Sequence, residues 1–528
     1  MLETRELLNI KEASIWATEH IGKDVTPSNI TYLINYGRIL KTEKNGATLI
    51  PKQELIDYYE SYQREAVYKK KLGADLNWAL SFDQYKESET TKHVHRLHPY
   101  KGKFIPQLVE YFLDNHTDKF KTETFFKQGD IVLDPFCGSG TTLVQANELG
   151  INAIGIDISA FNALISNIKV KKVNLVELQT YINDISQWLR AFTCEQYNVE
   201  FETKLTEYLN RYNNKYFPSP EFKIKARKKE IDEKSYATKH EAIVLKKYKE
   251  VIELYDVKLK QEKNERFLDK WFVAPIREEI EFVSEQIKQV KSQEIRDVLT
   301  VILSRTIRSC RATTHADLAT LVEPVTTTYY CAKHGKICKP LFTIVSWWER
   351  YAKDTIKRLA EFDTLRTDTE QICLNGDSTN IDILAKLEKQ NKPLAALCEK
   401  QKIRGIFSSP PYVGLIDYHE QHAYAYDLFG FERRDAQEIG AMFKRQSKQA
   451  QAEYAEGISN VLNNCKKFLA EDSDIFLVAN DKYNLYPQIA ENADLQIVNQ
   501  YKRPVLNRSE QDETPYSEKI FHLKKLER

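Results

Sequence analysis

The chain has 528 residues, which is too long for one small hydrophobic core and predicts two or three domains. Lys and Arg total 77 against 76 Asp and Glu, so the net charge of +1 neither favours nor excludes a nucleic-acid partner. The sequence lacks a run of about 18 apolar residues and a signal-peptide pattern, and its eight cysteines do not suggest a disulfide framework. We therefore expect a cytoplasmic protein with no membrane partner.

Residues 1–64 are predicted to form a separate unit. Pro27 stands at the first position of a helix that Gly37 ends, and Asn45-Gly46 is typical of a hairpin turn. This order of helix, turn, helix and hairpin resembles an excisionase-like winged helix-turn-helix, whose second helix enters the major groove. A small helical cap that binds protein or nothing is the alternative. The resemblance implies DNA contacts by Ser28, Asn29, Thr31, Tyr32, Asn35 and Arg38.

Residues 131–142 (Ile-Val-Leu-Asp-Pro-Phe-Cys-Gly-Ser-Gly-Thr-Thr) predict a strand, a tight loop and the start of a helix. Gly138 and Gly140 leave room for a ligand to approach the backbone, and the helix N-terminus offers N–H groups. No Lys-Ser/Thr pair follows the glycines, which disfavours a phosphate-binding P-loop. Asp157 ends the next predicted strand, where an acid would hold ribose hydroxyls. An ordinary turn between strand and helix is the alternative.

The sheet pattern lapses between the second strand and residue 371. Residues 218–291 are dense in Lys and Glu and predict helices with solvated faces. We therefore expect residues 193–368 to form a mainly helical inserted domain. A role in target recognition and a role as scaffold or dimerisation arm both remain open for this domain.

The end of the predicted insertion contains three arginines beside hydroxyl residues, with no acid among them. Arg305, Arg308 and Arg311 are therefore the best local candidates for contacts with DNA phosphates. A helix that packs with its arginine stems is the alternative.

Cys331, His334 and Cys338 are three soft metal ligands within eight residues. They would need Cys310 or His315 as a fourth ligand to hold zinc. Because the spacing supplies only three, we assign no metal site from the sequence. A tight turn with buried thiols is the favoured interpretation.

The sheet resumes with a third predicted strand that ends at Asp377. A fourth strand, residues 404–408, leads directly into Ser409-Pro-Pro-Tyr412. Residues 474–479 predict a fifth strand, and residues 495–503 and 518–523 a terminal antiparallel pair.

Two of these stretches resemble motifs of one family. Residues 134–142 are similar to the S-adenosylmethionine (AdoMet) loop of DNA amino-methyltransferases, and residues 409–412 are similar to their catalytic motif. The resemblance covers roughly residues 92–167 and 371–523. It implies an α/β fold with a Rossmann-like methyltransferase sheet built from residues 65–192 and 369–528. Residues 95–113 resemble the segment that forms one wall of the cofactor site.

The resemblance implies two sets of site residues. The implied AdoMet contacts are Lys103, Phe104, Pro106, Asp134, Pro135, Phe136, Cys137, Gly138, Ser139, Gly140, Thr141, Thr142, Asp157, Ile158, Asp377 and Ser378. The implied catalytic residues are Ser409, Pro410, Pro411 and Tyr412.

The Ser-Pro-Pro-Tyr motif suits methylation of an exocyclic amine, whose lone pair is delocalised into the ring. Acceptors at both amino protons favour a more tetrahedral nitrogen, and Ser409 Oγ and the Pro410 carbonyl can supply them. Two prolines fix the backbone and contribute no N–H group. Tyr412 offers a face for an extruded base, with stacking worth roughly 1–3 kcal/mol. None of the eight cysteines follows a proline, which disfavours cytosine-C5 methylation.

These observations predict a site-specific DNA methyltransferase, the modification enzyme of a restriction system with a possible cognate endonuclease. Ser in the first motif position favours cytosine N4 within the family, and adenine N6 is the alternative. An RNA base methyltransferase and a non-enzymatic regulator with a decayed core are further alternatives. The expected partner is double-stranded DNA.

Overall fold

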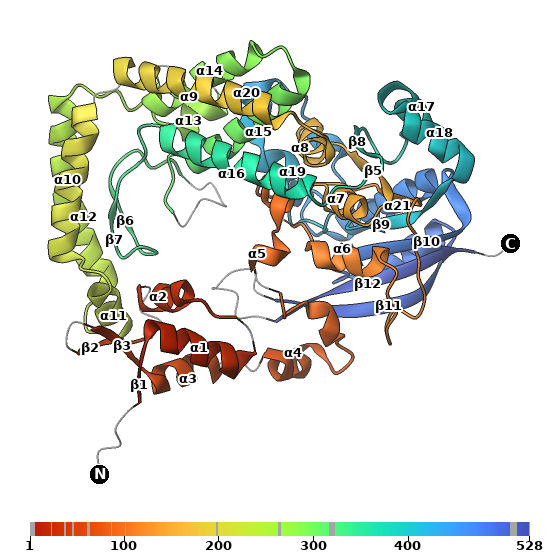
Figure 1. Cartoon of the computed structure of the whole chain (residues 1–528), viewed down its shortest axis with the longest axis horizontal. Coiled ribbons are helices and arrows are strands. Elements are labelled where there is room, and N and C mark those ends of the chain that lie inside the picture. Colours follow the sequence, from red (N-terminus) through yellow and green to blue (C-terminus); the bar gives the residue numbers. More distant parts are fainter. Residues whose placement is uncertain are drawn as a thin grey trace. The chain divides into compact units, whose positions relative to one another are not determined.

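The structure is a computed structural model that describes most of the chain. The described residues are 6–526, without 23, 36–38, 45–46, 61–63, 86, 101, 197–198, 262–265, 316–322 and 507–514. The chain forms two compact units (Figure 1). Unit 1 comprises residues 1–66, 189–280 and 308–344, and unit 2 comprises residues 67–188, 281–307 and 345–528.

Unit 2 is built around a seven-stranded sheet (Figure 1). In spatial order its strands are β11 (Leu495–Val505), β12 (Tyr516–Lys525), β10 (Leu469–Ala479), β9 (Ile403–Ser408), β4 (Ile131–Asp134), β5 (Asn152–Asp157) and β8 (Gln371–Asn375). The pairs from β10 to β8 are parallel, whereas β12 runs antiparallel to both β10 and β11. The predicted mainly parallel sheet and its terminal antiparallel pair are confirmed.

The strand order reverses beside β4, which has β5 on one side and β9 on the other. In the register of the two central strands, Leu133 lies opposite Ile406. The glycine-rich loop and the Ser-Pro-Pro-Tyr motif therefore leave neighbouring strands at the same edge. Ligands of open parallel sheets bind at such a reversal point.

Helices cover both faces of this sheet. The core on one face includes Leu133 and Ile475 from the strands, and the helices packed there are α17 (Ile383–Gln390), α18 (Lys392–Gln401), α21 (Lys448–Lys466) and α22 (Tyr486–Asn492). On the other face, the ring of Phe112 in α6 (Pro106–Leu113) lies 5.6 Å from Phe407 and 4.8 Å from Phe476. All four residues of β4 are buried, as expected for a strand covered on both faces.

The remaining helices of unit 2 connect and flank these layers. They are α4 (Arg64–Leu72), which begins in unit 1, α5 (Glu87–Thr90), α7 (Thr141–Glu148), α8 (Ala160–Val170), α16 (Val345–Asp363), α19 (Tyr418–Gln421) and α20 (Ala423–Phe429). Three long helices run from one unit into the other: α9 (Leu175–Gln196), α14 (Ala274–Lys288) and α15 (Gln293–Ser309).

The N-terminal part of unit 1 has its own hydrophobic core. Its elements are β1 (Leu7–Asn9), α1 (Ile10–Ile21), α2 (Pro27–Asn35), β2 (Thr42–Lys44), β3 (Ala47–Pro51) and α3 (Lys52–Glu60). Asn9 caps α1 through a reciprocal pair of hydrogen bonds with Glu12. Ala17 and Ile30 belong to the buried core. The expected helices and hairpin strands are present, and the predicted turn at residues 45–46 and helix end at Gly37 lie outside the described residues.

The rest of unit 1 is mainly helical. It contains α10 (Val199–Tyr216), α11 (Glu221–Arg227), α12 (Glu233–Leu254) and α13 (Phe267–Trp271), together with a hairpin of β6 (Tyr329–Cys331) and β7 (Lys336–Cys338). The helices expected over residues 218–291 are therefore present.

The expected inserted domain, residues 193–368, is divided between the two units. Residues 281–307 and 345–368 belong to unit 2. The physical reason is the buried face of α15, where Ser304 Oγ lies 2.8 Å from His98 Nε2 and 3.0 Å from Tyr424 Oη. Among the residues that the structure describes, no helix has both the length and the apolar content required to cross a membrane.

Two adjacent tryptophans of α16 provide a test of the packing in unit 2. Trp348 is fully buried and its Nε1 donates to Ser186 Oγ at 2.9 Å, whereas Trp347 is half-buried and stacks on Tyr351. Trp348→Ala is expected to lower the free energy of unfolding by about 3–5 kcal/mol because it leaves a cavity. Trp347→Ala is the matched control and should cost much less. Urea denaturation followed by circular dichroism measures both, and equal losses would contradict this packing.

Candidate functional site

A pocket lies at the carboxyl edge of the parallel strands in unit 2. It encloses about 850 Å³, including its open mouth. Its walls come from the loops that follow β4, β5, β8 and β9 and from residues that precede α6. This position is where the strand order of the sheet reverses.

Most of the residues predicted from the sequence line this pocket. From the predicted cofactor set, these are Lys103, Phe104, Pro135, Phe136, Cys137, Gly138, Ser139, Thr141, Asp157, Ile158, Asp377 and Ser378. From the predicted catalytic set, Ser409 and Pro411 line the same space. Two motifs that lie far apart in the chain therefore face one cavity.

Six predicted residues are not part of the pocket wall: Pro106, Asp134, Gly140, Thr142, Pro410 and Tyr412. Pro106 begins α6, and its side chain is buried. Gly140 has φ +74°, and a Cβ at this position would lie 2.9 Å from Ser166 Cβ. Gly140 is thus required for close packing of the loop against α8 rather than for direct contact with the pocket.

Asp134 connects the two motifs. Its carboxylate accepts hydrogen bonds from Thr142 Oγ1 at 2.6 Å, on the helix after the glycine loop, and from Ser408 Oγ at 2.5 Å. The backbone N–H of Phe136 donates to the same carboxylate at 3.2 Å. Burial raises the pKa of Asp134 to about 6. Ser408 directly precedes Ser409, so Asp134 is a positioning residue for both loops.

Gly138 brings the loop against an aromatic side chain. Its φ is +51°, and a Cβ at this position would lie 3.0 Å from Tyr100 Oη. The Gly138 N–H donates to Asp157 Oδ2 at 2.8 Å. A side chain at residue 138 would therefore strain the backbone and displace the pocket wall.

Asp157 lies at the end of β5 and faces the pocket. In addition to the Gly138 N–H, two donors reach Asp157 Oδ1. They are the Ser159 N–H at 2.8 Å and Asn162 Nδ2 at 3.2 Å. Burial raises the pKa of Asp157 to about 7, against the opposing effect of these donors. The carboxylate is therefore held in one orientation and titrates near neutral pH.

The pocket wall contains polar atoms that suit a polar ligand. Ser139 Oγ and Asn162 Oδ1 are buried and have no hydrogen-bond partner within the described part of the chain. Lys103 Nζ donates to the His95 carbonyl at 2.7 Å, and burial lowers its pKa to about 8. Unpartnered buried polar atoms are costly unless a ligand or water completes them. These polar atoms suit a ligand that carries several hydroxyl or amino groups.

Tyr412 is anchored on its phenol end. Its Oη donates to Glu518 Oε1 of β12 at 2.7 Å, and Arg503 Nη1 lies 3.7 Å from the other oxygen of Glu518. Burial, followed by the neighbouring Glu518 carboxylate, holds the pKa of Tyr412 well above its usual range. Sequence reasoning missed Glu518 because this partner lies more than 100 residues further along the chain.

The pocket wall also contains residues that the implied contact set does not name. Two of them, Tyr100 and Gly102, lie in the predicted wall segment 95–113, and the others are Asn162, Tyr418, Gln437, Glu438, Ile439 and Val461. The rings of Tyr100 and Tyr418 stack with their centroids 6.1 Å apart. The buried His419 forms two hydrogen bonds with the Glu438 carboxylate, one from its backbone N–H and one through its ring Nδ1. Residues 414–426 are rich in aromatic and histidine side chains, a local pattern that indicates Tyr418, whereas no local pattern indicates Gln437 or Glu438.

Arg305 and Arg311 are predicted to contact DNA phosphates from the protein surface. This prediction is wrong, because both side chains are buried. The guanidinium of Arg305 pairs with Asp354 at 2.5 Å, bonds Thr355 Oγ1 at 2.9 Å and lies over Tyr351 at 4.4 Å. Arg311 Nε donates to the Arg308 carbonyl at 3.1 Å. These two arginines therefore pack inside the fold, which is the alternative that the sequence left open. Arg308 is half-buried, and its contact with DNA stays a prediction.

The predicted contact residues of α2 are only partly described. Ser28, Asn29 and Tyr32 are exposed, and the side chain of Asn29 accepts from both Thr26 N and Thr26 Oγ1. Thr31 Oγ1 donates to the carbonyl of Pro27 at 2.9 Å. Arg38 and the side chain of Asn35 lie outside the described residues.

Known proteins match this chain over very different lengths. A family described as DNA methylase matches residues 7–167. The type II methyltransferase M.MjaII of Methanocaldococcus jannaschii is 47% identical over 527 residues, 98% of this chain and 97% of that protein. The type II methyltransferase M.MvaI of Kocuria varians is 30% identical over 123 residues, 23% of this chain and 26% of that protein. A tRNA (guanine(10)-N2)-dimethyltransferase of M. jannaschii is 36% identical over 72 residues, 11% of this chain and 20% of that protein.

The bridge made by Asp134 can be tested by two substitutions. Asp134→Ala leaves the buried Ser408 hydroxyl without its acceptor and Thr142 Oγ1 with only the 3.5 Å bond to the Phe407 carbonyl, and it should destabilise unit 2 by about 2 kcal/mol or more. Asp134→Asn keeps the shape and one acceptor oxygen, so its loss should be smaller. Urea denaturation of both variants at pH 8 measures the difference. An alanine variant as stable as the wild type would show that the bridge does not stabilise the loops.

Proposed function

The chain belongs to the DNA amino-methyltransferases of the type II methyltransferase family, and we propose that it methylates cytosine N4 within a specific duplex sequence. The observation that carries the proposal is the pairing of β4 with β9, which brings the glycine loop and Ser409 to one pocket. Two loops at one sheet edge can hold a methyl donor and an acceptor base within reach of each other.

S-adenosylmethionine is the methyl donor of this family, and when bound it supplies a methyl group carried on a sulfonium sulfur. We assign the ribose hydroxyls to Asp157 and the adenine amino group to Asp377, because both acids line the pocket. Gly138 keeps the loop free of a side chain that would narrow the site. The unpartnered oxygens of Ser139 and Asn162 are then available as further polar contacts.

We assign the target amine to Ser409 and Pro410. Ser409 Oγ accepts a hydrogen bond from one amino N–H, and the Pro410 carbonyl accepts a hydrogen bond from the other. Both bonds raise the electron density on the nitrogen. Pro410 and Pro411 have fixed φ and no N–H, so no backbone donor competes for the site. No general base is required before attack because the nitrogen loses its proton readily once it becomes cationic. Positioning therefore supplies most of the rate enhancement, about 7–11 kcal/mol.

Tyr412 is assigned to stacking on the extruded base. The bond to Glu518 restrains the phenol, so less side-chain entropy is lost when a base stacks on the ring. Stacking of roughly 1–3 kcal/mol is comparable with the few kcal/mol needed to unstack a base. The pair Tyr412–Glu518 thus offsets part of the cost of base extrusion.

The choice of cytosine rests on the residue at position 409. A serine there is more common in family members that act on cytosine N4, whereas Asp or Asn accompanies adenine N6. Adenine N6 is therefore the alternative acceptor.

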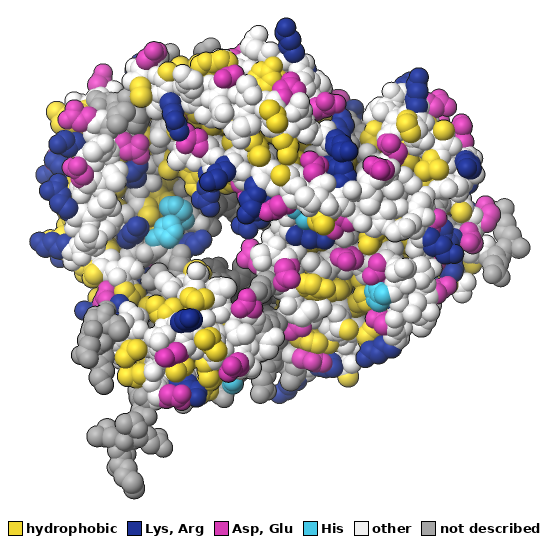
Figure 2. Space-filling view, in the orientation of Figure 1, with side chains coloured by type: hydrophobic (Ala, Val, Ile, Leu, Met, Phe, Trp, Pro, Cys, Tyr) yellow, Lys and Arg dark blue, Asp and Glu magenta, His cyan; other side chains and the backbone are white. Residues whose placement is uncertain are grey.

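Candidate DNA contacts lie in unit 1. Figure 2 shows Lys and Arg side chains along the edge of the view that α10 and α12 occupy. The exposed cations of these helices include Lys204, Arg211, Lys239, Lys246 and Lys249. Exposed cations of this kind bind phosphates without sequence preference. We propose that residues 189–280 and 308–344 recognise the target sequence and that the N-terminal winged helix-turn-helix also contacts DNA. We further propose that the protein acts in a restriction system together with a cognate endonuclease.

The product of the reaction tests the proposal directly. Purified protein with labelled AdoMet is incubated with unmethylated duplex DNA or with tRNA, and the products are digested to nucleosides for mass spectrometry. We expect N4-methylcytosine from DNA and no label in tRNA. Ser409→Ala should lower the turnover roughly tenfold or more, because one acceptor is lost. N6-methyladenine would overturn the assignment of the base, and label in tRNA alone would overturn DNA as the substrate.

The raised pKa of Asp157 predicts a pH-dependent affinity for AdoMet. The ionised carboxylate accepts from hydroxyls, and protonation below its pKa of about 7 removes an acceptor. Affinity should therefore fall about tenfold from pH 8 to pH 6. Calorimetry should show that Asp157→Asn binds AdoMet more weakly and that its affinity changes less with pH. Tyr412→Ala is the control that should keep both affinity and slope while losing turnover, and a similar loss of affinity in both variants would contradict this division of roles.

A further inference from the structure

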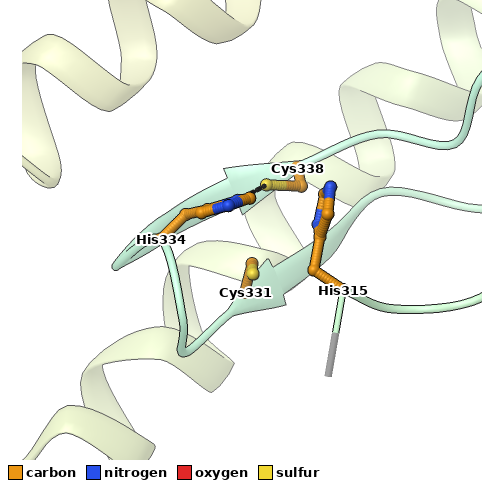
Figure 3. Close-up of side chains that lie close together, drawn as sticks. All are labelled: His315, Cys331, His334 and Cys338. Carbon is orange, nitrogen blue, oxygen red and sulfur yellow. Dashed lines mark hydrogen bonds between the residues drawn. The ribbon is translucent and has the colours of Figure 1, made fainter. Parts of the chain in front are cut away.

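Four soft metal ligands meet at the hairpin of unit 1. His315, Cys331, His334 and Cys338 each offer one ligand atom, and these atoms all lie within 4.8 Å of one another (Figure 3). Cys338 Sγ lies 3.7 Å from His334 Nδ1. Four ligands around one tetrahedral zinc ion are separated by roughly 3.3–3.8 Å, given bonds of about 2.0–2.3 Å. The separation of 3.7 Å between Cys338 Sγ and His334 Nδ1 lies in this range, and the whole cluster is close to the dimensions of a closed zinc site.

The local backbone places these ligands. Cys331 ends β6, Cys338 ends β7, and His334 lies on the turn between them. Gly335 has φ +62°, and its N–H donates to the Cys331 carbonyl at 2.7 Å. A Cβ on Gly335 would lie 2.5 Å from Lys223 Cδ. The turn is thus tight, and the side chain of Cys338 points toward the ring of His334 (Figure 3).

His315 completes the set from a different segment, which follows α15. Its Nδ1 lies 2.8 Å from Tyr329 Oη, a hydrogen bond that fixes the plane of the ring. Ligating histidines are commonly held by such a partner on the nitrogen that does not bind the metal. Cys310, the other candidate for a fourth ligand, is buried and lies outside the cluster.

We propose that His315, Cys331, His334 and Cys338 bind one structural Zn²⁺ ion. Two thiolates balance the charge of the ion, and four protein ligands leave no open position for water, so the site is structural rather than catalytic. Cys331 and Cys338 form no disulfide, which leaves both sulfurs to coordinate. A mixed set of two sulfur and two nitrogen ligands favours zinc over calcium or magnesium.

The ion would stabilise a hairpin that has few interactions of its own. Each strand has three residues, and a two-stranded hairpin of this size is marginal in water. Asn213 of α10 bonds both the N–H and the carbonyl of Ile337, and Tyr330 Oη donates to Glu233 of α12. The zinc would add a link between this hairpin and the segment around His315. It would therefore fix the surface that α10, α12 and the hairpin form together.

A second group of possible ligands does not share these features. His93, His95 and Glu148 also lie close together. Glu148 already pairs with Lys92 at 2.6 Å, so a cation is in place there. Among the described residues that group has three ligands and no thiolate, and we assign it no metal.

Metal content of the purified protein tests the proposal. The protein is prepared under reducing conditions without chelator or metal affinity resin, and zinc is measured by plasma mass spectrometry. We expect about one zinc per chain. Replacement by Co²⁺ should give the visible absorption bands of a tetrahedral thiolate site. Removal of zinc by a strong chelator should lower the midpoint of thermal unfolding, and added zinc should restore it.

Substitutions assign the ligands. Cys331→Ser and Cys338→Ser should each lose the zinc, whereas Cys194→Ser, at an exposed cysteine of the same unit, should keep it. His315→Cys keeps a zinc ligand at its position and should retain the metal, in contrast to His315→Ala. The cobalt spectrum of the wild type does not depend on whether any variant folds.

Three results would overturn the proposal. The first is a purified protein that contains no zinc and, when reduced, does not bind added Zn²⁺ or Co²⁺. The second is a Cys331–Cys338 disulfide in the native protein. The third is zinc that remains bound in both cysteine variants. Methyl transfer is not among these measurements, so failure of the metal site and failure of the proposed function are distinguishable.

Discussion

One buried carboxylate determines how the pocket is assembled. Asp134 accepts a hydrogen bond from Thr142, on the helix after the glycine loop, and another from Ser408, at the end of β9. Without it the Ser408 hydroxyl would lose its acceptor and Thr142 Oγ1 would keep only a 3.5 Å bond to the Phe407 carbonyl, so the carboxylate holds the two loops in one arrangement. Burial of the acid is unfavourable, as its raised pKa of about 6 indicates, and the hydrogen bonds offset that penalty. A methyl donor and an acceptor base can react only if their two loops keep a fixed separation.

Local sequence was sufficient to predict the parts of the site that depend on local geometry. Gly138 and Gly140 have positive φ, and the tight loop between β4 and α7 requires them, so spacing alone indicated the turn. Ser409 follows a buried strand of the predicted sheet. The parallel order of β4, β5, β8 and β9 follows from alternating strands and helices together with the handedness of their connections. The functional roles given to these residues stay predictions.

Features that depend on distant partners were not predictable in the same way. The sequence predicts Arg305 at the surface because its neighbours carry no acid, yet Asp354 lies beside it on another helix. Glu518 reaches Tyr412 from β12, and Glu438 lines the pocket from the end of a short 3-10 helix, Asp435–Gln437. Periodicity shows that one helix face is buried but not which residue it meets. The pairing of charges across a core is therefore the information that a single sequence lacks.

The pairing of β4 with β9 also has a consequence for the order in which the protein folds. Leu133 and Ile406 are partners in the central register although more than 270 residues separate them. The entropy of closing such a loop grows only slowly with its length, so the intervening chain costs the final structure little. Its effect is kinetic, since β4 and β5 must wait for a late segment before the centre of the sheet can close. Until then β4 exposes an unpaired edge, which favours aggregation of the incomplete chain.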